Sequence, residues 1–158
     1  MKKISIIVPA YNEEESLPFL YERLTKLIDS INDYEFEVLF INDGSKDNTI
    51  GELKKIVKNS KNNIKVVNFS RNFGKEAAMY AGLKEADGDF VSFIDADLQQ
   101  RPEVLLDMFN VLIENDEYDC VGAFQDVRSE GKVLSFFKDS FYKLINGGMV
   151  VDLLREVH

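Results

Sequence analysis

The stretch SFIDADLQQRPE (residues 92–103) joins an apolar run to two aspartates, Asp95 and Asp97, that stand one residue apart. The apolar residues before Asp95 are typical of a buried strand, so both carboxylates fall where that strand ends. A buried carboxylate without a partner destabilises a fold. The pair therefore predicts a site at which a cation or another partner compensates the charge.

Working outward from this stretch, apolar runs of strand length alternate with helical patterns along most of the chain. We expect strands within residues 4–11, 36–43, 64–70, 88–97 and 118–124, and helices within residues 16–31, 50–59, 74–86, 102–114 and 132–146. This alternation with short connections predicts an α/β fold, with a mostly parallel sheet and helices on both faces. In such sheets, ligands bind beyond the carboxyl ends of the strands.

The charge of the 158-residue chain is strongly acidic, with a formal net value of -9. This balance argues against a nucleic-acid partner, because phosphate backbones are bound by basic surfaces. It is compatible with a divalent-cation site, although solvated acidic helix faces explain most of these charges equally well. The single cysteine, Cys120, is expected to pack on the last predicted strand, which excludes a disulfide framework and a thiolate metal site.

The N-terminus does not have the pattern of a secretion signal, because its short apolar run ends at Pro9 and is followed by acids. No apolar stretch reaches the roughly 18–20 residues that span a bilayer. We therefore expect a cytoplasmic location.

Charged residues follow the other predicted strands as well. Glu13 and Asp43 follow the first two strands, and Arg71 and Lys75 follow the third. The glycine fingerprints of dinucleotide sites and P-loops are absent, so phosphates must be bound in another way. A D-x-D pair alone is a weak signal, but at the end of a buried strand it favours Mg²⁺ or Mn²⁺ held by the two aspartates.

Four segments of the chain, VPAYNEEESL, INDGSKDNT, FSRNFGKEAAMYAGLKEADGDFVSFIDADLQQRPE and FYKLIN, resemble the family 2 glycosyltransferases. They are similar, more narrowly, to the branch that loads sugars onto polyprenyl phosphates such as dolichol or bactoprenol phosphate. The resemblance implies a Rossmann-like GT-A fold and a metal-dependent, inverting transfer of a hexosyl group from a UDP- or GDP-sugar to a polyprenyl phosphate. A saccharide acceptor in cell-surface polysaccharide synthesis, or a nucleotide-binding fragment without turnover, remain the alternatives.

The resemblance also implies roles for individual residues. The nucleotide-sugar would be contacted by Pro9, Tyr11, Asn12, Glu13, Asp43, Arg71, Asn72 and Lys75. The metal and the diphosphate would be held by Asp95, Asp97 and Gln99, with the two aspartates as the catalytic residues and no general base assigned. The residues themselves leave other roles open: Tyr11 can cap the sheet edge, Asp43 can serve only its turn, and Arg71 and Lys75 can be solvated charges.

The chain departs from the family pattern near its C-terminus. Basic residues usually follow the fifth strand, and the first one here is Arg128, the expected acceptor contact. After FYKLIN the chain passes into GGMVVDLLREVH without the G-A-x-D-F-R-L motif. We therefore expect residues 1–146 to form the donor-binding domain and residues 147–158 to be a remnant of an acceptor-side region. The resemblance places the full-length protein at the inner face of the cell membrane, and a homo-oligomer is left open.

Overall fold

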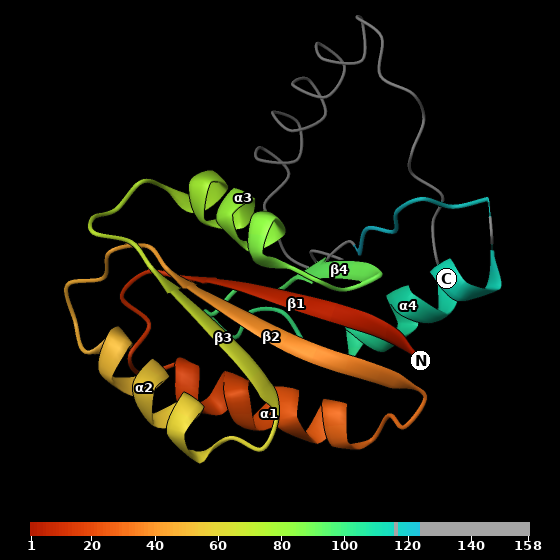
Figure 1. Cartoon of the computed structure of the whole chain (residues 1–158), viewed down its shortest axis with the longest axis horizontal. Helices are drawn as coiled ribbons and strands as arrows, with labels where there is room; N and C mark the ends of the chain where they lie inside the picture. The colour runs from red at the N-terminus through yellow and green to blue at the C-terminus, as the bar shows by residue number, and fades with distance from the viewer. Residues whose placement is uncertain (116, 124–158) are drawn as a thin grey trace, which may run out of the picture. The chain divides into compact units, whose positions relative to one another are not determined.

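Four parallel strands form the sheet in the computed structural model, which describes residues 1–115 and 117–123 (Figure 1). The strands are β1 Lys2–Ala10, β2 Tyr34–Asn42, β3 Asn63–Asn68 and β4 Phe90–Phe93. Their order in the sheet is β3-β2-β1-β4, so the direction of strand addition reverses at β1. The predicted parallel α/β fold is confirmed.

Helices cover both faces of this sheet, as the sequence predicted. They are α1 Leu17–Asp29, α2 Thr49–Asn59, α3 Lys75–Glu85 and α4 Val104–Glu114. Helices α1, α2 and α4 bury their apolar side chains against one face, and α3 lies on the other (Figure 1). The alternating residues of β1 serve the two cores, with Ile6 and Val8 in the first and Ile7 in the second.

Helix α3 approaches the sheet closely because small residues face it. Ala78 is fully buried, and a Cβ added to Gly82 would lie only 2.3 Å from Cγ2 of Ile7. Any larger side chain at position 82 would force the helix away from β1. The small residues thus fix the distance between α3 and β1, the strand whose end carries the predicted nucleotide contacts Pro9 and Tyr11.

The fifth strand expected at residues 118–124 does not form in the part of this segment that the structure describes. Residues 117–123 contain no strand, and Cys120 is exposed rather than packed. The Tyr118 amide donates instead to the Asn115 carbonyl at 3.0 Å, in a turn that follows α4. An apolar run forms a strand only where a neighbouring strand offers hydrogen bonds, and the run itself does not encode that neighbour.

Several predictions concern parts of the chain outside the described residues. These are the helix within residues 132–146, the acceptor contact of Arg128, and the remnant at residues 147–158. The domain boundary at residue 146 also stays a prediction. Among the described helices, each is too short or too polar to cross a bilayer.

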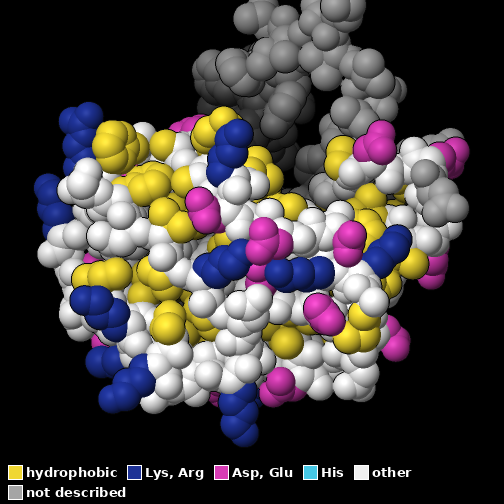
Figure 2. Space-filling model, in the orientation of Figure 1, with side chains coloured by type: hydrophobic (Ala, Val, Ile, Leu, Met, Phe, Trp, Pro, Cys, Tyr) yellow, Lys and Arg dark blue, Asp and Glu magenta, His cyan; other side chains and the backbone are white. Residues whose placement is uncertain are grey.

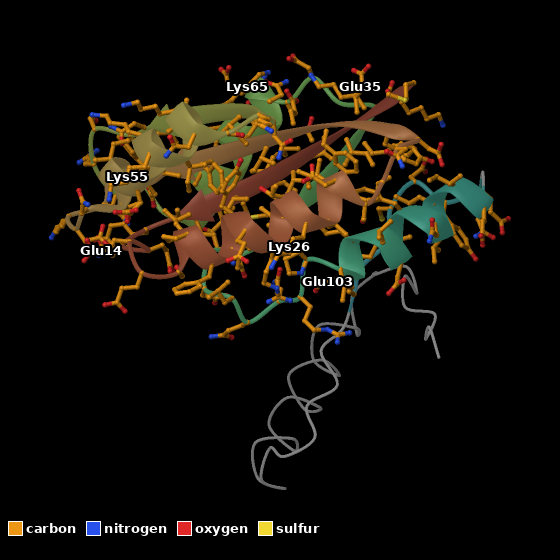
Figure 3. The ribbon with its side chains drawn as sticks, turned by 90° about the horizontal axis from the view of Figure 1, so that it is seen from below. Glu14, Lys26, Glu35, Lys55, Lys65 and Glu103 are labelled. Carbon is orange, nitrogen blue, oxygen red and sulfur yellow. The ribbon has the colours of Figure 1, made fainter. Side chains whose placement is uncertain are left out.

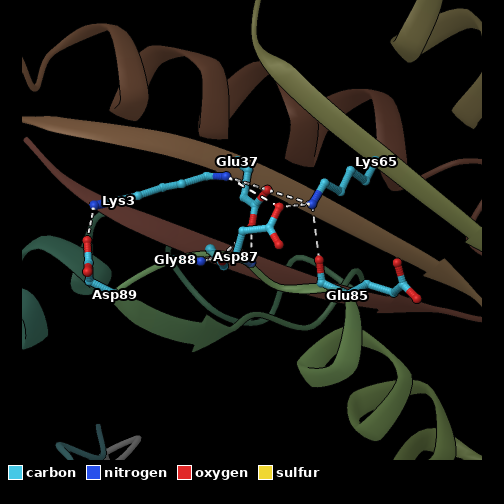
Figure 4. A network of polar contacts seen from close by, with 8 residues as sticks. Lys3, Glu37, Lys65, Glu85, Asp87, Gly88 and Asp89 are labelled. Atoms are coloured by element: carbon cyan, nitrogen blue, oxygen red, sulfur yellow. Dashed lines mark hydrogen bonds and ion pairs between the residues drawn. The ribbon is translucent and has the colours of Figure 1, made fainter.

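A buried carboxylate, Glu37 of β2, contacts β1, β3 and the loop before β4 (Figure 4). Its side chain has no exposed surface, and its Oε1 atom accepts hydrogen bonds from the Ser5 hydroxyl at 2.6 Å and the Asp87 amide at 2.8 Å. Its Oε2 atom lies 3.0 Å from Nζ of Lys3 and 3.1 Å from Nζ of Lys65. The carboxylate thereby ties β1, β2 and β3 to the loop that leads into β4.

The hydrogen bonds of Glu37 outweigh the effect of its burial on its ionisation. Burial alone would raise the pKa of this carboxyl group. The Asp87 amide, the Ser5 hydroxyl and the ammonium groups of Lys3 and Lys65 stabilise the charged form and lower the pKa to about 2. The folded protein therefore favours the ionised carboxylate much more strongly than the unfolded chain does.

Exposed ion pairs contribute less to the free energy of unfolding than the buried contacts of Glu37 do. Acidic and basic side chains lie next to one another across the face drawn in Figure 2. Arg23 and Glu103, 2.8 Å apart, connect α1 to the start of α4, where Glu103 is labelled in Figure 3. Both side chains of this pair are accessible to water, and such pairs contribute about 0–1 kcal/mol. Glu37 is the charged group on which the sheet depends more heavily.

A second carboxylate, Asp43, connects the end of β2 to the start of α3. Asp43 is only 3% exposed, and its amide donates to the Ala10 carbonyl at 2.9 Å. Its Oδ1 atom accepts the Phe73 amide at 2.7 Å, and its Oδ2 atom accepts the Gly74 amide at 2.9 Å. Both carboxylate oxygens therefore hold the backbone immediately before α3.

Replacing Glu37 with Gln should lower the free energy of unfolding at neutral pH by about 2–3 kcal/mol, because the two ammonium groups lose their buried counter-ion. The pKa of Glu37 lies below its ordinary value of 4.5, so its contribution is complete above that value and is lost as the pH falls toward 2. The difference between wild type and Glu37→Gln in urea denaturation should therefore shrink over this acidic range.

Glu35→Gln is the matched control, because Glu35 is exposed on the same strand (Figure 3). It should change the free energy of unfolding by less than about 0.5 kcal/mol. Equal effects of the two substitutions, or a difference that does not depend on pH, would contradict the structural role of Glu37.

Asp43→Asn should destabilise the protein by about 1–3 kcal/mol, because an amide NH₂ group would then face one of two backbone donors. The effect should be local. Hydrogen exchange at the amides of Phe73 and Gly74 should accelerate more than exchange in the centre of β1. Asp33→Asn, at an exposed position, is the control. Unaltered exchange at both amides in Asp43→Asn would show that this carboxylate does not hold the start of α3.

Candidate active site

Most of the predicted site residues lie together at the end of the sheet opposite the N-terminus (Figure 1). A hollow of about 260 Å³ opens there between the ends of β1 and β4, where the strand order reverses. Ligands of open parallel sheets bind at this kind of crevice. Its walls come from the ends of three strands and the start of α3: Pro9, Ala10, Tyr11, Glu13, Asp43, Asn72, Gly74, Lys75, Ala78, Asp95, Ala96 and Asp97.

The crevice exists because β1 and β4 stop pairing early. The two strands pair only from Ile4 to Ile7 of β1, and the Ile94 amide then donates to the Ile7 carbonyl at 3.0 Å. The next β1 residue that faces β4 is Pro9, which has no amide hydrogen to continue the ladder. The chain beyond Ile94 is therefore free to diverge from β1.

The turns after β1 and β2 are held together by side-chain to backbone hydrogen bonds. The Asn12 amide donates to the Ser45 hydroxyl at 2.9 Å, and the Lys46 amide donates to Oδ1 of Asn12 at 2.8 Å. The Glu14 amide donates to Asp47 at 3.1 Å. Asn12, a predicted nucleotide contact, thus connects the two turns and does not line the hollow. Its contact with the nucleotide stays a prediction.

Tyr11 and Glu13 do line the hollow. The Tyr11 side chain is 39% exposed, which leaves its ring accessible to a ligand. The Glu13 amide donates to the Thr49 hydroxyl at 2.8 Å, and its carboxylate accepts a hydrogen bond from the Ser16 hydroxyl. The first contact holds the Glu13 backbone, and the second orients its carboxylate beside the hollow.

The segment before α3 lies against the turn that follows β2. Gly44 has a φ of 63°, a conformation that glycine adopts without strain, and a Cβ at this position would lie 2.2 Å from the backbone of Arg71. Asn72 and Lys75 line the hollow, whereas Arg71 does not. The Arg71 guanidinium lies 4.7 Å from the centre of the exposed Phe73 ring, in a cation–π contact.

The D-A-D-L-Q turn after β4 places both aspartates in the hollow. Oδ1 of Asp95 lies 2.5 Å from Nζ of Lys75, and Oδ2 accepts a hydrogen bond from Nε2 of Gln100 at 3.3 Å. Oδ1 of Asp97 accepts the Gln99 amide at 3.0 Å. The Gln99 side chain does not line the hollow, so its predicted part in metal binding stays a prediction, and Gln100 is a neighbour of Asp95 that the sequence did not indicate.

Two residues of this region have unusual backbone conformations. Asn12 has a φ of 57° and Leu98 a φ of 63°, and they are the non-glycine residues of the described chain with a positive φ. Asn tolerates this conformation, but for Leu it is a strained one. Backbone strain of this kind is concentrated at functional sites. Leu98 lies one residue after Asp97, which is consistent with a turn shaped for binding.

The donor atoms in the hollow fit a hard divalent cation. Asp95 and Asp97 supply carboxylate oxygens, and Mg²⁺ or Mn²⁺ commonly takes one or two protein carboxylates with water and substrate phosphates. Among the described residues, no group of three or more His, Cys, Asp or Glu side chains gathers around one point. The site therefore fits a cation shared with a phosphate ligand better than a closed cage of protein ligands.

Small residues complete the hollow and were not predicted from the sequence. Ala10, Ala78 and Ala96 are buried and line the hollow, as does Gly74 at the start of α3. Their short side chains leave the space that a ligand would fill. Alanine and glycine directly beside the motif residues were the only signal in the sequence.

Comparison with known proteins agrees with the fold and the site described above. The sequence profile of the family described as Glycosyl transferase family 2 matches residues 5–148. CsbB of Bacillus subtilis (strain 168), assigned as a glycosyltransferase, is 41% identical over 150 residues, which cover 95% of this chain and 44% of CsbB. The undecaprenyl-phosphate 4-deoxy-4-formamido-L-arabinose transferase of Proteus mirabilis (strain HI4320) is 36% identical over 146 residues, covering 92% of this chain and 43% of that protein.

Solved structures with the same fold include S. aureus TarS, with a TM-score of 0.60 and 30% identity over 81% of this chain and 24% of TarS. Residues 1–349 of TarS have also been solved with UDP-GlcNAc. Glucosyl-3-phosphoglycerate synthase of Mycobacterium tuberculosis, solved with Mn²⁺ and UDP-glucose, has a TM-score of 0.54 and 26% identity over 73% of this chain and 40% of that one.

This chain spans less than half the length of the curated relatives that it matches. The family profile nevertheless covers almost all of its sequence, and the strand tips carry the family's motifs in one hollow. The chain belongs to glycosyl transferase family 2, with the GT-A fold.

Proposed function

We propose that this chain is the donor-binding part of a metal-dependent, inverting glycosyltransferase that moves a hexosyl group from a UDP- or GDP-sugar to a polyprenyl phosphate. One observation carries the proposal. Asp95 and Asp97 line the same hollow as Tyr11 and Asp43, at the point where the strand order of a parallel sheet reverses. Residues 1–146 would form this donor-binding domain.

The proposed roles follow from the position of each group. Pro9, Tyr11 and Glu13 would receive the nucleoside, and the turn positioned by Asp43 would border it. Asn72, in the segment before α3, and Lys75, the first residue of α3, would face the diphosphate, because helix N-termini and ammonium groups favour anions. A divalent cation bound to Asp95 and Asp97 would supply Lewis-acid stabilisation to the departing diphosphate.

A polyprenyl phosphate is the acceptor that we favour. The Proteus mirabilis relative is named as an undecaprenyl-phosphate transferase. An oxygen of the acceptor phosphate would attack C1 of the sugar, the bond from C1 to the diphosphate would break, and the anomeric configuration would invert. This acceptor would place the full-length protein at the cytoplasmic face of a membrane. A UDP-sugar donor is supported by the TarS and glucosyl-3-phosphoglycerate synthase structures, which contain UDP-GlcNAc and UDP-glucose.

The metal assignment predicts that Asp97→Asn weakens Mn²⁺-dependent nucleotide binding by about tenfold or more, because one of two carboxylate ligands is lost. Thermal-shift measurements with UDP and GDP, with and without MnCl₂, test this, since a bound ligand raises the unfolding temperature. Asp107→Asn, on the exposed side of α4, should retain the wild-type shift. Unchanged metal dependence in Asp97→Asn would refute the metal site.

The acceptor assignment predicts transfer of labelled sugar to undecaprenyl phosphate and not to free saccharides. In the full-length protein, Arg128→Ala should raise the KM for undecaprenyl phosphate by about five- to tenfold, because one ionic contact with the phosphate is lost. Lys58→Ala, on the exposed side of α2, should leave this KM unchanged. Transfer only to a saccharide would favour the polysaccharide alternative, and nucleotide binding without any transfer would favour a fragment without turnover.

A further inference from the structure

The ion pair between Lys75 and Asp95 connects the start of α3 to the turn that follows β4. Nζ of Lys75 lies 2.5 Å from Oδ1 of Asp95, and the two side chains are 56% and 29% exposed. Both residues line the hollow. The ammonium group thus occupies one oxygen of a carboxylate that we have proposed as a metal ligand.

Lys75 stands at a position that does not favour a lysine. It is the first residue of α3, where the positive end of the helix dipole repels a cation. The acidic residue that suits this end of the helix is its neighbour Glu76. The stability of α3 therefore does not explain a lysine at position 75. The contact of Lys75 with Asp95 explains it.

The second oxygen of Asp95 is also engaged. Oδ2 accepts a hydrogen bond from Nε2 of Gln100 at 3.3 Å, and Oε1 of Gln100 accepts the Asp95 amide at the same distance. A cation that binds Oδ1 of Asp95 therefore competes with the Lys75 ammonium for this oxygen. Asp97, by contrast, contacts the Gln99 amide through a single oxygen, Oδ1.

We propose that Lys75 is an exchangeable counter-ion of Asp95: it holds the D-A-D turn in the donor-free state, and the divalent cation displaces it. The released ammonium group then contacts the diphosphate of the donor. This inference rests on the proposed function. Lys75 would thus oppose binding of the metal alone and favour binding of the metal together with the diphosphate.

The partial exposure of this pair makes the exchange feasible. Solvent-exposed ion pairs are weak, so competition from Lys75 should lower the affinity for a metal by only about two- to fivefold. The Glu37 network is a useful contrast (Figure 4), because its central carboxylate is fully buried and contacts two ammonium groups. Loss of both ammonium groups would leave the buried Glu37 carboxylate without a counter-ion, whereas the partly exposed Asp95 can exchange one cation for another.

Lys75→Met tests the proposal, because methionine keeps an unbranched side chain without the charge. Titration calorimetry of the full chain with MnCl₂ alone should show about two- to fivefold tighter binding than in the wild type. With MnCl₂ saturating, the affinity for UDP or GDP, whichever the wild type binds, should fall by about tenfold. Lys75→Arg should remain near the wild type in both titrations.

Lys84→Met is the matched control, since Lys84 is exposed on the same helix with its ammonium 5.5 Å from the Tyr80 ring. It should change neither affinity. A loss of fold in Lys75→Met would weaken both ligands together, so opposite changes in the two affinities identify the exchange.

Two results would overturn the proposal in different ways. If the wild type binds MnCl₂ and a nucleoside diphosphate but Lys75→Met binds the metal no more tightly, the exchange is wrong and the proposed function stands. If the wild type binds neither ligand, the proposed function fails and the exchange fails with it.

Discussion

The early end of pairing between β1 and β4 is the constraint on which the site depends. The hydrogen bond from the Ile94 amide to the Ile7 carbonyl is followed on β1 by Pro9, which has no hydrogen to donate. Strand order reverses at the same place, and a crevice for ligands opens at such a point in a parallel sheet. The separated ends of β1 and β4 expose Asp95 and Asp97 to a ligand and keep the strands below them fully paired.

The carboxylates at the two ends of the sheet have opposite environments. At the amino end, Glu37 has no exposed surface and is surrounded by donors from three other segments, which lowers its pKa to about 2. At the carboxyl end, Asp95 keeps partial exposure and one short ion pair. A permanent network at one end fixes the position of β4, and a replaceable contact at the other lets the tip of β4 accept a ligand.

Much of this arrangement could be predicted from the sequence, because its signals are local or periodic. The four strands and four helices followed from apolar runs and helical spacing, and the clustering of Glu13, Asp43 and Asp95 followed from their places after parallel strands. A strand within residues 118–124 could not be predicted from an apolar run alone, because its formation requires a neighbouring strand to pair with.

Contacts of long side chains were the other part that the sequence could not supply. Gln99 and Gln100 are identical in type, and only the geometry of the turn brings Gln100 to Asp95. The sequence likewise did not indicate that both carboxylate oxygens of Asp43 accept hydrogen bonds from the backbone before α3.

The charge of the hollow follows from the residues that line it. Its walls include four carboxylates and one ammonium group, a formal charge of −3. A diphosphate entering alone would be repelled, so the electrostatics favour a divalent cation that binds before the donor or with it.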